Sequence, residues 1–381
     1  MRAVMVTKFV PLPDNDGGKQ RALALARRLA AHAELVLCAY DEGGADVAGM
    51  KRLGVDVRSV PWRPTPARAG RGVLRTGSVS AGRFWSPELH DEVRRAAAEG
   101  PVDLLQVEYL QMAPVARGVA ARRRVLDLHN VESALVRSYA RAGRGPAALA
   151  VAAEAVALGA MERRVIPGFD TVVVVSERER GRLPAGARHV LVCPNGRDPD
   201  PEGPPEPAAT PTAAFVATMG WAPNVDAALW FADQVWPGVL RRLPEARLLL
   251  VGREPAPSVQ ALASPSVEVS GTVDEIRPYL ARARVAVAPL RAGGGTRLKI
   301  LEALDAGRPV VATSIAADGL EDLVGEGVVL ADDAAAMVEA VSGLLADADG
   351  AAALGRAGRR AVAARHSWDA ALAPLLGEVT V

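Results

Sequence analysis

The sequence predicts an α/β protein built from two doubly wound parallel sheets. Short apolar runs rich in Val and Leu alternate with amphipathic helical segments along all 381 residues. Continuous apolar runs, unlike alternating ones, are typical of strands that helices cover on both faces. A segment rich in proline and acidic residues at 196–212 separates the two halves and predicts an extended linker.

Thirteen segments have the length and apolar content of buried strands. In the first half they are 3–6, 34–40, 55–60, 102–107, 124–128, 171–175 and 188–192; in the second half they are 213–217, 246–251, 266–270, 284–288, 309–312 and 328–330. Helical patterns between them make βα units, which favour parallel pairing. We therefore expect two Rossmann-like domains, at 1–195 and 213–365, followed by a C-terminal helix at 366–381.

Bulk composition excludes several classes of protein. Half of the residues are apolar, yet we find no run long enough to span a bilayer. A strand follows the first two residues with no hydrophobic leader, so we expect a cytoplasmic protein. Cys38 and Cys193 are the two cysteines and lie far apart, which argues against a disulfide framework and a structural zinc site.

The net charge of +1 conceals an asymmetry. Residues 1–195 hold 29 Lys and Arg against 20 Asp and Glu, whereas the remaining residues hold 16 against 24. Either the two halves attract each other, or the first half meets an anionic partner such as an acidic acceptor or a membrane surface.

One stretch of the first half, 58–87, contains no acidic residue. Its six arginines are interleaved with Trp62, Phe84 and Trp85. We expect a mobile loop on the acceptor side. Nucleic acid would fit the composition, but no nucleic-acid module surrounds the stretch, so no nucleic-acid partner is expected. A peripheral contact with the inner face of a membrane remains open.

A strand, a glycine loop and a helix together predict a phosphate site at 285–306. After an apolar strand come Gly293, Gly294 and Gly295, and Thr296 then offers an N-cap hydroxyl to a helix over 297–306. Small residues let an anion approach unpaired backbone N–H groups at the positive end of the helix dipole. Arg297 and Lys299 disfavour an isolated helix N-terminus, which an anion resting there would offset.

The segment GGTRLKILEA at 294–303 resembles the nucleotide-sugar site of GT-B glycosyltransferases, especially the retaining glycosyltransferase family 4. The family signature has two glutamates with seven residues between them. Glu302 matches the second, which in the family binds the donor ribose, and Gly294 replaces the first, as in one branch of the family. The resemblance implies two domains facing a cleft, metal-independent transfer from an NDP-sugar, and a final helix that returns to the first domain.

Further matches fall on the donor half. The resemblance implies donor contacts from residues around the expected strand ends: Gly220, Gly252, Arg253, Gly271, Thr272, Val273, Gly295, Thr296 and Leu298. Many family members carry an arginine and a lysine after the 213–217 strand, where this chain has Met219 and Trp221. Arg297 and Lys299 could replace them as cationic stabilisers of the departing diphosphate; a surface pair of Lys299 with Glu302 is the simpler alternative.

In the first half, Gly17, Gly18 and Lys19 open a helix after the first strand and predict a second anion loop, for donor phosphate or acceptor. His129 follows the 124–128 strand. A lone histidine is usually structural, but family members have one at this position, which implies that it orients the donor sugar. Asn130, Glu108 and Tyr109 are acceptor-side candidates.

Several signatures are decoys or absent. Asp198 and Asp200 form a DxD, which lies in the linker. The chain has no Gly-Lys-Ser/Thr loop end, no opening GxGxxG and no HExxH, so neither metal nor cofactor is expected. The predicted function is a retaining glycosyltransferase acting on a lipid-linked sugar, a polysaccharide intermediate or a small natural product. The alternatives are a non-catalytic GT-B binding protein and a nucleotide-sugar epimerase.

Overall fold

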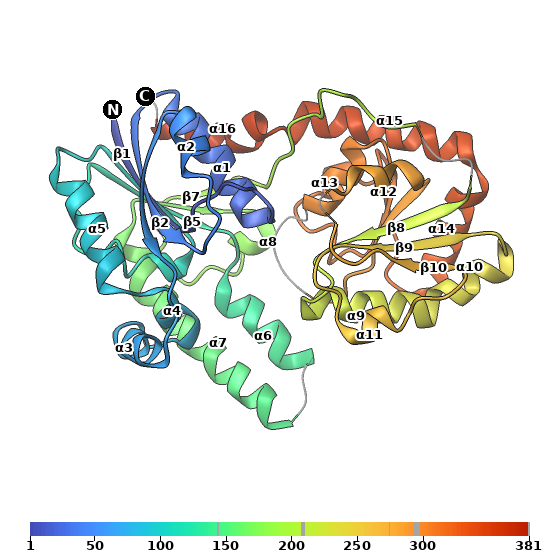
Figure 1. Ribbon diagram of the computed structural model, residues 1–381, viewed down its shortest axis with the longest axis horizontal. Coiled ribbons are helices and arrows are strands. Elements are labelled where there is room, and N and C mark those ends of the chain that lie inside the picture. The colour runs from blue at the N-terminus through green and yellow to red at the C-terminus, as the bar shows by residue number, and fades with distance from the viewer. Residues whose placement is uncertain (143–144, 207–209, 274, 293–297, 380–381) are drawn as a thin grey trace. The chain divides into compact units, whose positions relative to one another are not determined.

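The computed structural model describes residues 1–142, 145–206, 210–273, 275–292 and 298–379. Two compact units make up the chain (Figure 1). Unit 1 comprises Met1–Pro194 together with Leu372–Val381, and unit 2 comprises Asn195–Ala371. The end of the last helix is therefore counted with the first unit.

Unit 1 contains a parallel sheet of seven strands in the order β3-β2-β1-β4-β5-β6-β7. The strands are β1 (Arg2–Phe9), β2 (Glu34–Asp41), β3 (Val55–Pro61), β4 (Leu104–Glu108), β5 (Arg123–Leu128), β6 (Thr171–Val174) and β7 (Val190–Val192). Each overlaps a strand predicted from an apolar run. The central strands are almost fully buried, as expected for a sheet that helices cover on both faces.

The helices of unit 1 are α1 (Gly17–Ala30), α2 (Val47–Arg52), α3 (Pro66–Thr76), α4 (Val79–Phe84), α5 (Pro87–Ala98), α6 (Glu132–Ala142), α7 (Gly145–Val165) and α8 (Glu177–Arg180), and α16 (Trp368–Val379) ends in this unit. The expected loop at 58–87 is wrong: the segment contains α3 and α4. Its N-caps are Thr65 and Ser78, and Gly77 ends α3 in the left-handed conformation (φ 77°). The sequence has these capping residues, but the arginines between them obscured the helical period.

Helix α7 differs from the expectation that no run could span a bilayer. Within the described residues, Gly145–Gly168 is long and apolar enough to do so by length and composition. However, α7 packs along α6, and Glu162 accepts hydrogen bonds from the Ser133 backbone and hydroxyl at 2.9 and 2.6 Å. These contacts make α7 a helix of the folded unit.

Unit 2 contains a parallel sheet of six strands in the order β10-β9-β8-β11-β12-β13. The strands are β8 (Thr212–Val216), β9 (Arg247–Val251), β10 (Val267–Val269), β11 (Val285–Ala288), β12 (Val310–Ala312) and β13 (Val328–Leu330). The helices are α9 (Ala222–Trp230), α10 (Trp236–Arg242), α11 (Pro257–Gln260), α12 (Arg277–Arg282), α13 (Leu298–Asp305), α14 (Ala334–Ala346) and α15 (Ala348–Arg365). Short 3-10 turns lie at Leu110–Met112 and Ile166–Gly168 in unit 1 and at Glu321–Leu323 in unit 2, and a π turn lies at Phe231–Val235 in unit 2.

The DxD of the linker is used to hold unit 2 together. Asp198 accepts a hydrogen bond from the backbone N–H of Trp368 at 3.0 Å, and Asp200 pairs with Arg277. Both carboxylates therefore have partners within unit 2.

Both sheets reverse their strand order at one point. In unit 1 the reversal lies between β1 and β4, and in unit 2 it lies between β8 and β11. Connections leave such a pair of strands toward opposite faces of the sheet, so a crevice forms at their carboxyl ends, where α/β proteins bind ligands. The topology alone thus directs attention to residues 8–18 and 108–130 in unit 1, and to residues 217–224 and 289–302 in unit 2.

Candidate functional site

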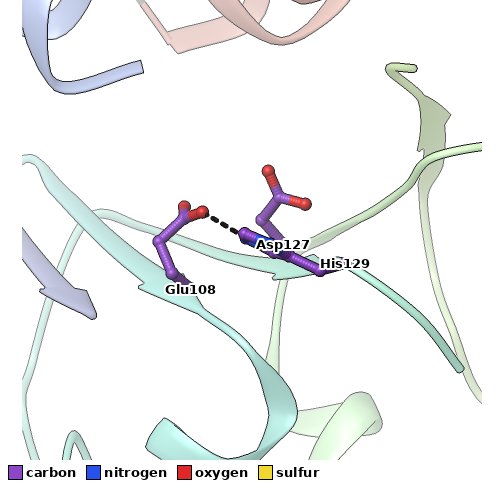
Figure 2. A group of neighbouring side chains, drawn as sticks. All are labelled: Glu108, Asp127 and His129. Atoms are coloured by element: carbon purple, nitrogen blue, oxygen red, sulfur yellow. Dashed lines mark hydrogen bonds and ion pairs between the residues drawn. The ribbon is translucent and has the colours of Figure 1, made fainter. Parts of the chain in front are cut away.

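The carboxyl ends of β4 and β5 bring together three side chains with titratable groups (Figure 2). Parallel register places Glu108 beside Asp127, and His129 lies two residues further along the same face. The Nε2 atom of His129 lies 2.8 Å from Oε2 of Glu108. Both glutamate and aspartate side chains are fully buried, and the histidine side chain is only 9% exposed.

Burial sets the protonation of this pair. Desolvation raises the pKa of Glu108 to about 7, although Arg21 and Gln106 favour its ionised form. Desolvation also lowers the pKa of His129 to about 3, against the attraction of Asp127. At neutral pH the imidazole is therefore uncharged and the Glu108 carboxyl is poised between its two forms. Such a pair can exchange a proton with a bound hydroxyl.

A buried arginine, Arg21, forms an ion pair with Asp127. The Nε atom of Arg21 in α1 donates to Oδ2 of Asp127 at 2.9 Å, and neither side chain is exposed to solvent. Its Nη1 donates to the backbone oxygen of Pro194 at 3.0 Å. Burial alone would lower the pKa of Arg21, but the neighbouring Asp127 and Glu108 carboxylates raise it. The guanidinium therefore stays charged and fixes the end of β5 to α1.

The ring of Tyr109 lies between a histidine and a lysine. It stacks on His129 with centroids 3.8 Å apart, and Nζ of Lys8 lies 3.9 Å from its centroid. Lys8 occupies the register irregularity of β1 between Val6 and Phe9, where a bulge redirects side chains. Desolvation lowers the pKa of Lys8, against the attraction of Glu132 and Asp16.

Tyr109 has a positive φ of 71°, which is strained for an aromatic residue. Strain of this kind costs about 1–3 kcal/mol and persists where surrounding contacts fix it. Its hydroxyl lies against Gly18: a Cβ at that glycine would come within 1.9 Å of the tyrosine oxygen. The glycine at the start of α1 thus admits the Tyr109 side chain.

The predicted first loop has partners within unit 1. Asp16 caps α1, and its Oδ1 accepts from the backbone N–H of Lys19 at 2.9 Å. The Lys19 ammonium pairs with Glu42, and Gly17 is the first residue of the helix. A carboxylate thus occupies the N-terminus that was expected to hold an anion from outside the chain. Asn130 is half-buried in the bend after β5.

Glu108, Asp127 and His129 are also residue types that ligate metals, and their ligand atoms lie within 4.8 Å of one another. The group is not apparent in the sequence because Glu108 lies far from the other two members. Arg21 already binds Asp127 with a permanent positive charge, and Glu108 engages the histidine Nε2. A divalent cation would have to displace both contacts, so the residues fit a hydrogen-bonded network better than a metal centre.

In unit 2, glycines allow the loops after β8 and β9 to pack closely. A Cβ on Gly252, whose φ is 146°, would lie 1.6 Å from the backbone oxygen of Ala217, and one on Gly220 would lie 2.7 Å from that of Glu254. The Met219 N–H donates to the oxygen of Arg253 at 2.9 Å. The two glycines thus let the loops after β8 and β9 pack closely at the carboxyl ends of these strands.

The segment after β10 continues this edge. Gly271 has a φ of 71°, and Thr272 accepts a hydrogen bond through Oγ1 from the backbone N–H of Glu254 at 3.3 Å. Val273 packs on the small apolar cluster formed by Ala214, Leu249, Val251 and Ala283. Arg253 is half-buried. The predicted base-reading segment therefore lies beside the turn that follows β9.

Helix α13 presents Lys299 at the β8–β11 reversal. Its Nζ donates to Oδ1 of Asn224 at 2.8 Å and lies 5.1 Å from the centroid of Phe215. Asn224 is oriented in turn by the backbone oxygen of Thr218, to which its amide donates at 2.9 Å. Glu302 lies one turn further along α13 and is half-buried.

The remaining predicted donor residues have mixed outcomes. Leu298 is buried at the first position of α13. Gly294, Gly295, Thr296 and Arg297 lie outside the described residues. Gly307, just after this helix, has a positive φ of 72°.

Four residues of these two edges were not predicted: Lys8, Arg21, Asp127 and Asn224. Two had signals in the sequence, because Lys8 is one of only four lysines and Asp127 interrupts an apolar strand. In the sequence Arg21 resembles any other helical arginine, and no neighbouring residue indicates its partner Asp127, which lies 106 residues away.

Comparisons with known proteins agree with this architecture. Residues 210–347 match the model of the family described as glycosyl transferases group 1. None of the curated protein sequences matches the chain.

Among solved structures, similarity extends over the whole chain. A sucrose-phosphate synthase from Thermosynechococcus elongatus is 20% identical with a TM-score of 0.72, covering 100% of this chain and 98% of that one. Anabaena HepE in complex with UDP-glucose is 14% identical with a TM-score of 0.67, and the coverages are 100% and 99%. A trehalose-phosphate synthase (UDP-forming) from Burkholderia vietnamiensis is 14% identical with a TM-score of 0.65 and the same coverages. The chain therefore has the GT-B fold, and residues 210–347 of its second unit are similar to glycosyl transferases group 1.

Proposed function

We propose that this protein is a retaining, metal-independent glycosyltransferase that moves a sugar from an NDP-sugar donor to an acceptor hydroxyl. The observation that carries the proposal is the match of residues 210–347 to glycosyl transferases group 1. It falls on unit 2, where Gly220 and Gly252 let the loops after β8 and β9 pack closely. HepE, a structural neighbour, was solved with UDP-glucose, which supports a nucleotide-sugar donor.

In this proposal unit 2 binds the donor. Glu302 accepts hydrogen bonds from the ribose hydroxyls, and the backbone of Gly271, Thr272 and Val273 contacts the base. The close approach of backbone at Gly252 lets the nucleotide lie flat against the strand ends. Because the base meets backbone rather than specific side chains, the nucleotide class is a matter for experiment.

Lys299 stabilises the charge that develops on the departing diphosphate. Its side chain is held by Asn224, so the ammonium is oriented before the donor arrives and little reorganisation is needed in the transition state. Arg297 would act in the same way from the preceding residues. A cation preorganised against a leaving group is worth more in the transition state than in the ground state.

Unit 1 binds the acceptor beside Glu108 and His129. The neutral imidazole orients the transferred sugar by hydrogen bonding, and the Glu108 carboxyl, poised near neutral pH, can hold the acceptor proton. Attack on the face that the leaving group vacates retains the anomeric configuration. The departing phosphate takes the proton if Glu108 already carries one.

The experiment combines product stereochemistry with a donor-site variant. NMR of the product should show the anomeric configuration of the donor, and an inverted product would refute retention. Glu302→Ala should weaken donor binding by roughly 1.5–3 kcal/mol for each charge-assisted hydrogen bond that is lost. Unchanged donor affinity in a folded variant would remove Glu302 from the ribose site.

Met219 and Trp221 occupy positions where many members of the family that this chain resembles have a basic pair. This difference favours a second candidate, a non-catalytic GT-B binding protein. Such a protein would bind the donor without releasing the nucleotide. A nucleotide-sugar epimerase would convert the donor in the absence of any acceptor, so product analysis with and without acceptors separates the three.

A further inference from the structure

An unusual surface lies on α3, α4 and the residues just before α3 in unit 1. We call it the arginine face, and it consists of exposed Arg63, Arg71, Leu74, Arg75, Val79 and Arg83. Leu74 is 89% exposed and Val79 is 57% exposed, and the 58–87 segment that contains the face has no acidic residue. Exposed apolar groups rimmed by polar residues are one mark of a protein or membrane interaction site.

The arginine face is a fixed platform. Helices α3 and α4 touch through glycines, since a Cβ on Gly72 would lie 2.0 Å from the backbone oxygen of Gly82. Glu154 of α7 accepts hydrogen bonds from the hydroxyl of Ser78 at 2.6 Å and from the backbone N–H of Val79 at 3.0 Å. The carboxylate of Glu154 thus caps α4. These contacts orient Leu74 and Val79 outward.

A cavity of about 220 Å³ opens beside this face. Its lining contains two arginines and a histidine but no carboxylate: Arg75, Trp85, His90, Pro114 and Arg117. The guanidinium of Arg75 lies 4.9 Å from the ring centroid of Trp85, and His90 is held through Nδ1 by the backbone oxygen of Val115 at 2.8 Å. Arginines that line a small cavity without a carboxylate favour an anion, and guanidinium groups are common partners of phosphate oxygens.

The aromatic residues of the segment point inward. Trp62 stacks on Phe84 with centroids 5.1 Å apart, and both pack against the main core of unit 1. Trp85 is only 8% exposed. Single-stranded nucleic acid requires exposed aromatic platforms for its bases, and the arginine face offers none. It exposes aliphatic side chains instead, as interfacial helices do.

We propose that the arginine face docks on an anionic phospholipid surface, with the cavity between Arg75 and Arg117 holding a lipid phosphate. Leu74 and Val79 enter the boundary between headgroups and acyl chains, and the surrounding arginines remain among the phosphates. Helix α7, joined to α4 through Glu154, adds further exposed apolar side chains at Leu149 and Val156. The inference does not depend on the proposed glycosyl transfer.

The test is co-sedimentation of the full chain with vesicles. The protein should bind phosphatidylcholine–phosphatidylglycerol vesicles in a salt-sensitive manner and should not bind pure phosphatidylcholine. Each basic residue near an anionic surface strengthens binding by about fivefold. Reversing two charges in Arg75→Glu/Arg117→Glu should therefore lower the partition coefficient by well over tenfold, and Leu74→Ser/Val79→Ser should lower it at unchanged net charge.

Arg241→Glu is the matched control, because Arg241 is an exposed arginine of α10 in unit 2; its binding should stay close to that of wild type. Circular dichroism melting of each variant shows that it is folded. Failure of the wild-type protein to bind anionic vesicles would overturn the proposal. So would equal losses for Arg75→Glu and Arg241→Glu, or vesicle binding that inorganic phosphate at low concentration abolishes completely.

Discussion

We expect the stability of the Glu108→Gln variant, measured relative to wild type, to increase as the pH rises from acidic to neutral. The carboxyl is fully buried, and burial raises its pKa from an ordinary value of 4.5 to about 7. Because the folded-state pKa is the higher one, the native protein keeps a proton that the unfolded chain has lost. The contribution of Glu108 to wild-type stability therefore falls as pH rises from about 4.5 to about 7, and it is constant above that window.

The pKa difference corresponds to roughly 3 kcal/mol. The glutamine side chain of Glu108→Gln cannot titrate, so the difference in unfolding free energy between the variant and wild type should grow through the window by up to that amount. The assay is urea unfolding at a series of pH values, and His129 titrates in both proteins. Glu88→Gln, which changes an exposed carboxylate of α5, is the control and should follow wild type. A Glu108→Gln difference that does not change with pH would refute the assignment of a desolvated carboxyl.

Three further predictions concern the two sites. Arg21→Met should cost about 3–5 kcal/mol of stability because it leaves the Asp127 carboxylate buried without its partner. The double variant Arg21→Met/Asp127→Leu should recover much of this loss in the same urea titration. Equal stability of the single variant and wild type would contradict the prediction. Gly252→Ala has no room for its Cβ, so its Tm and its nucleotide affinity should both fall, and an unchanged Tm would show that the loop can relax. Lys299→Met should lower kcat more than it raises the donor KM, whereas an effect confined to KM would assign the lysine to binding alone.

The strands were predictable because each is a compact apolar run. β8, for example, is TAAFV and is buried along most of its length, a pattern that reports burial without reference to the rest of the chain. Helices α3 and α4 were missed because arginines and glycines interrupt their apolar period, although Thr65 and Ser78 are ordinary N-caps. Capping residues were therefore better signals there than periodicity.

Candidate site residues were predictable one at a time, at strand ends, but their contacts were not. Glu108 was proposed from its position after a strand, and His129 from its position together with the family resemblance. Their 2.8 Å contact depends on the register that pairs Glu108 with Asp127, which a single sequence does not reveal. The same holds for Lys299 and Asn224, which are 75 residues apart.

Ion pairs and caps near the strand ends were beyond the sequence for the same reason. Lys19 was expected at an anion loop, yet its ammonium pairs with Glu42 and the helix N-terminus is capped by Asp16. Lys8, with no expected role, lies over the Tyr109 ring. Local sequence gives the number of charges near a strand end, and only the tertiary structure determines which of them have partners.

The most direct test of the central claim is a thermal-shift screen of UDP-, GDP-, ADP- and dTDP-sugars in the presence of EDTA. If unit 2 is a metal-independent donor site, one nucleotide class should raise the Tm in a saturable manner, and Glu302→Ala should lose that shift. If no nucleotide sugar raises the Tm of the folded wild-type protein at millimolar concentration, the donor-site account is wrong.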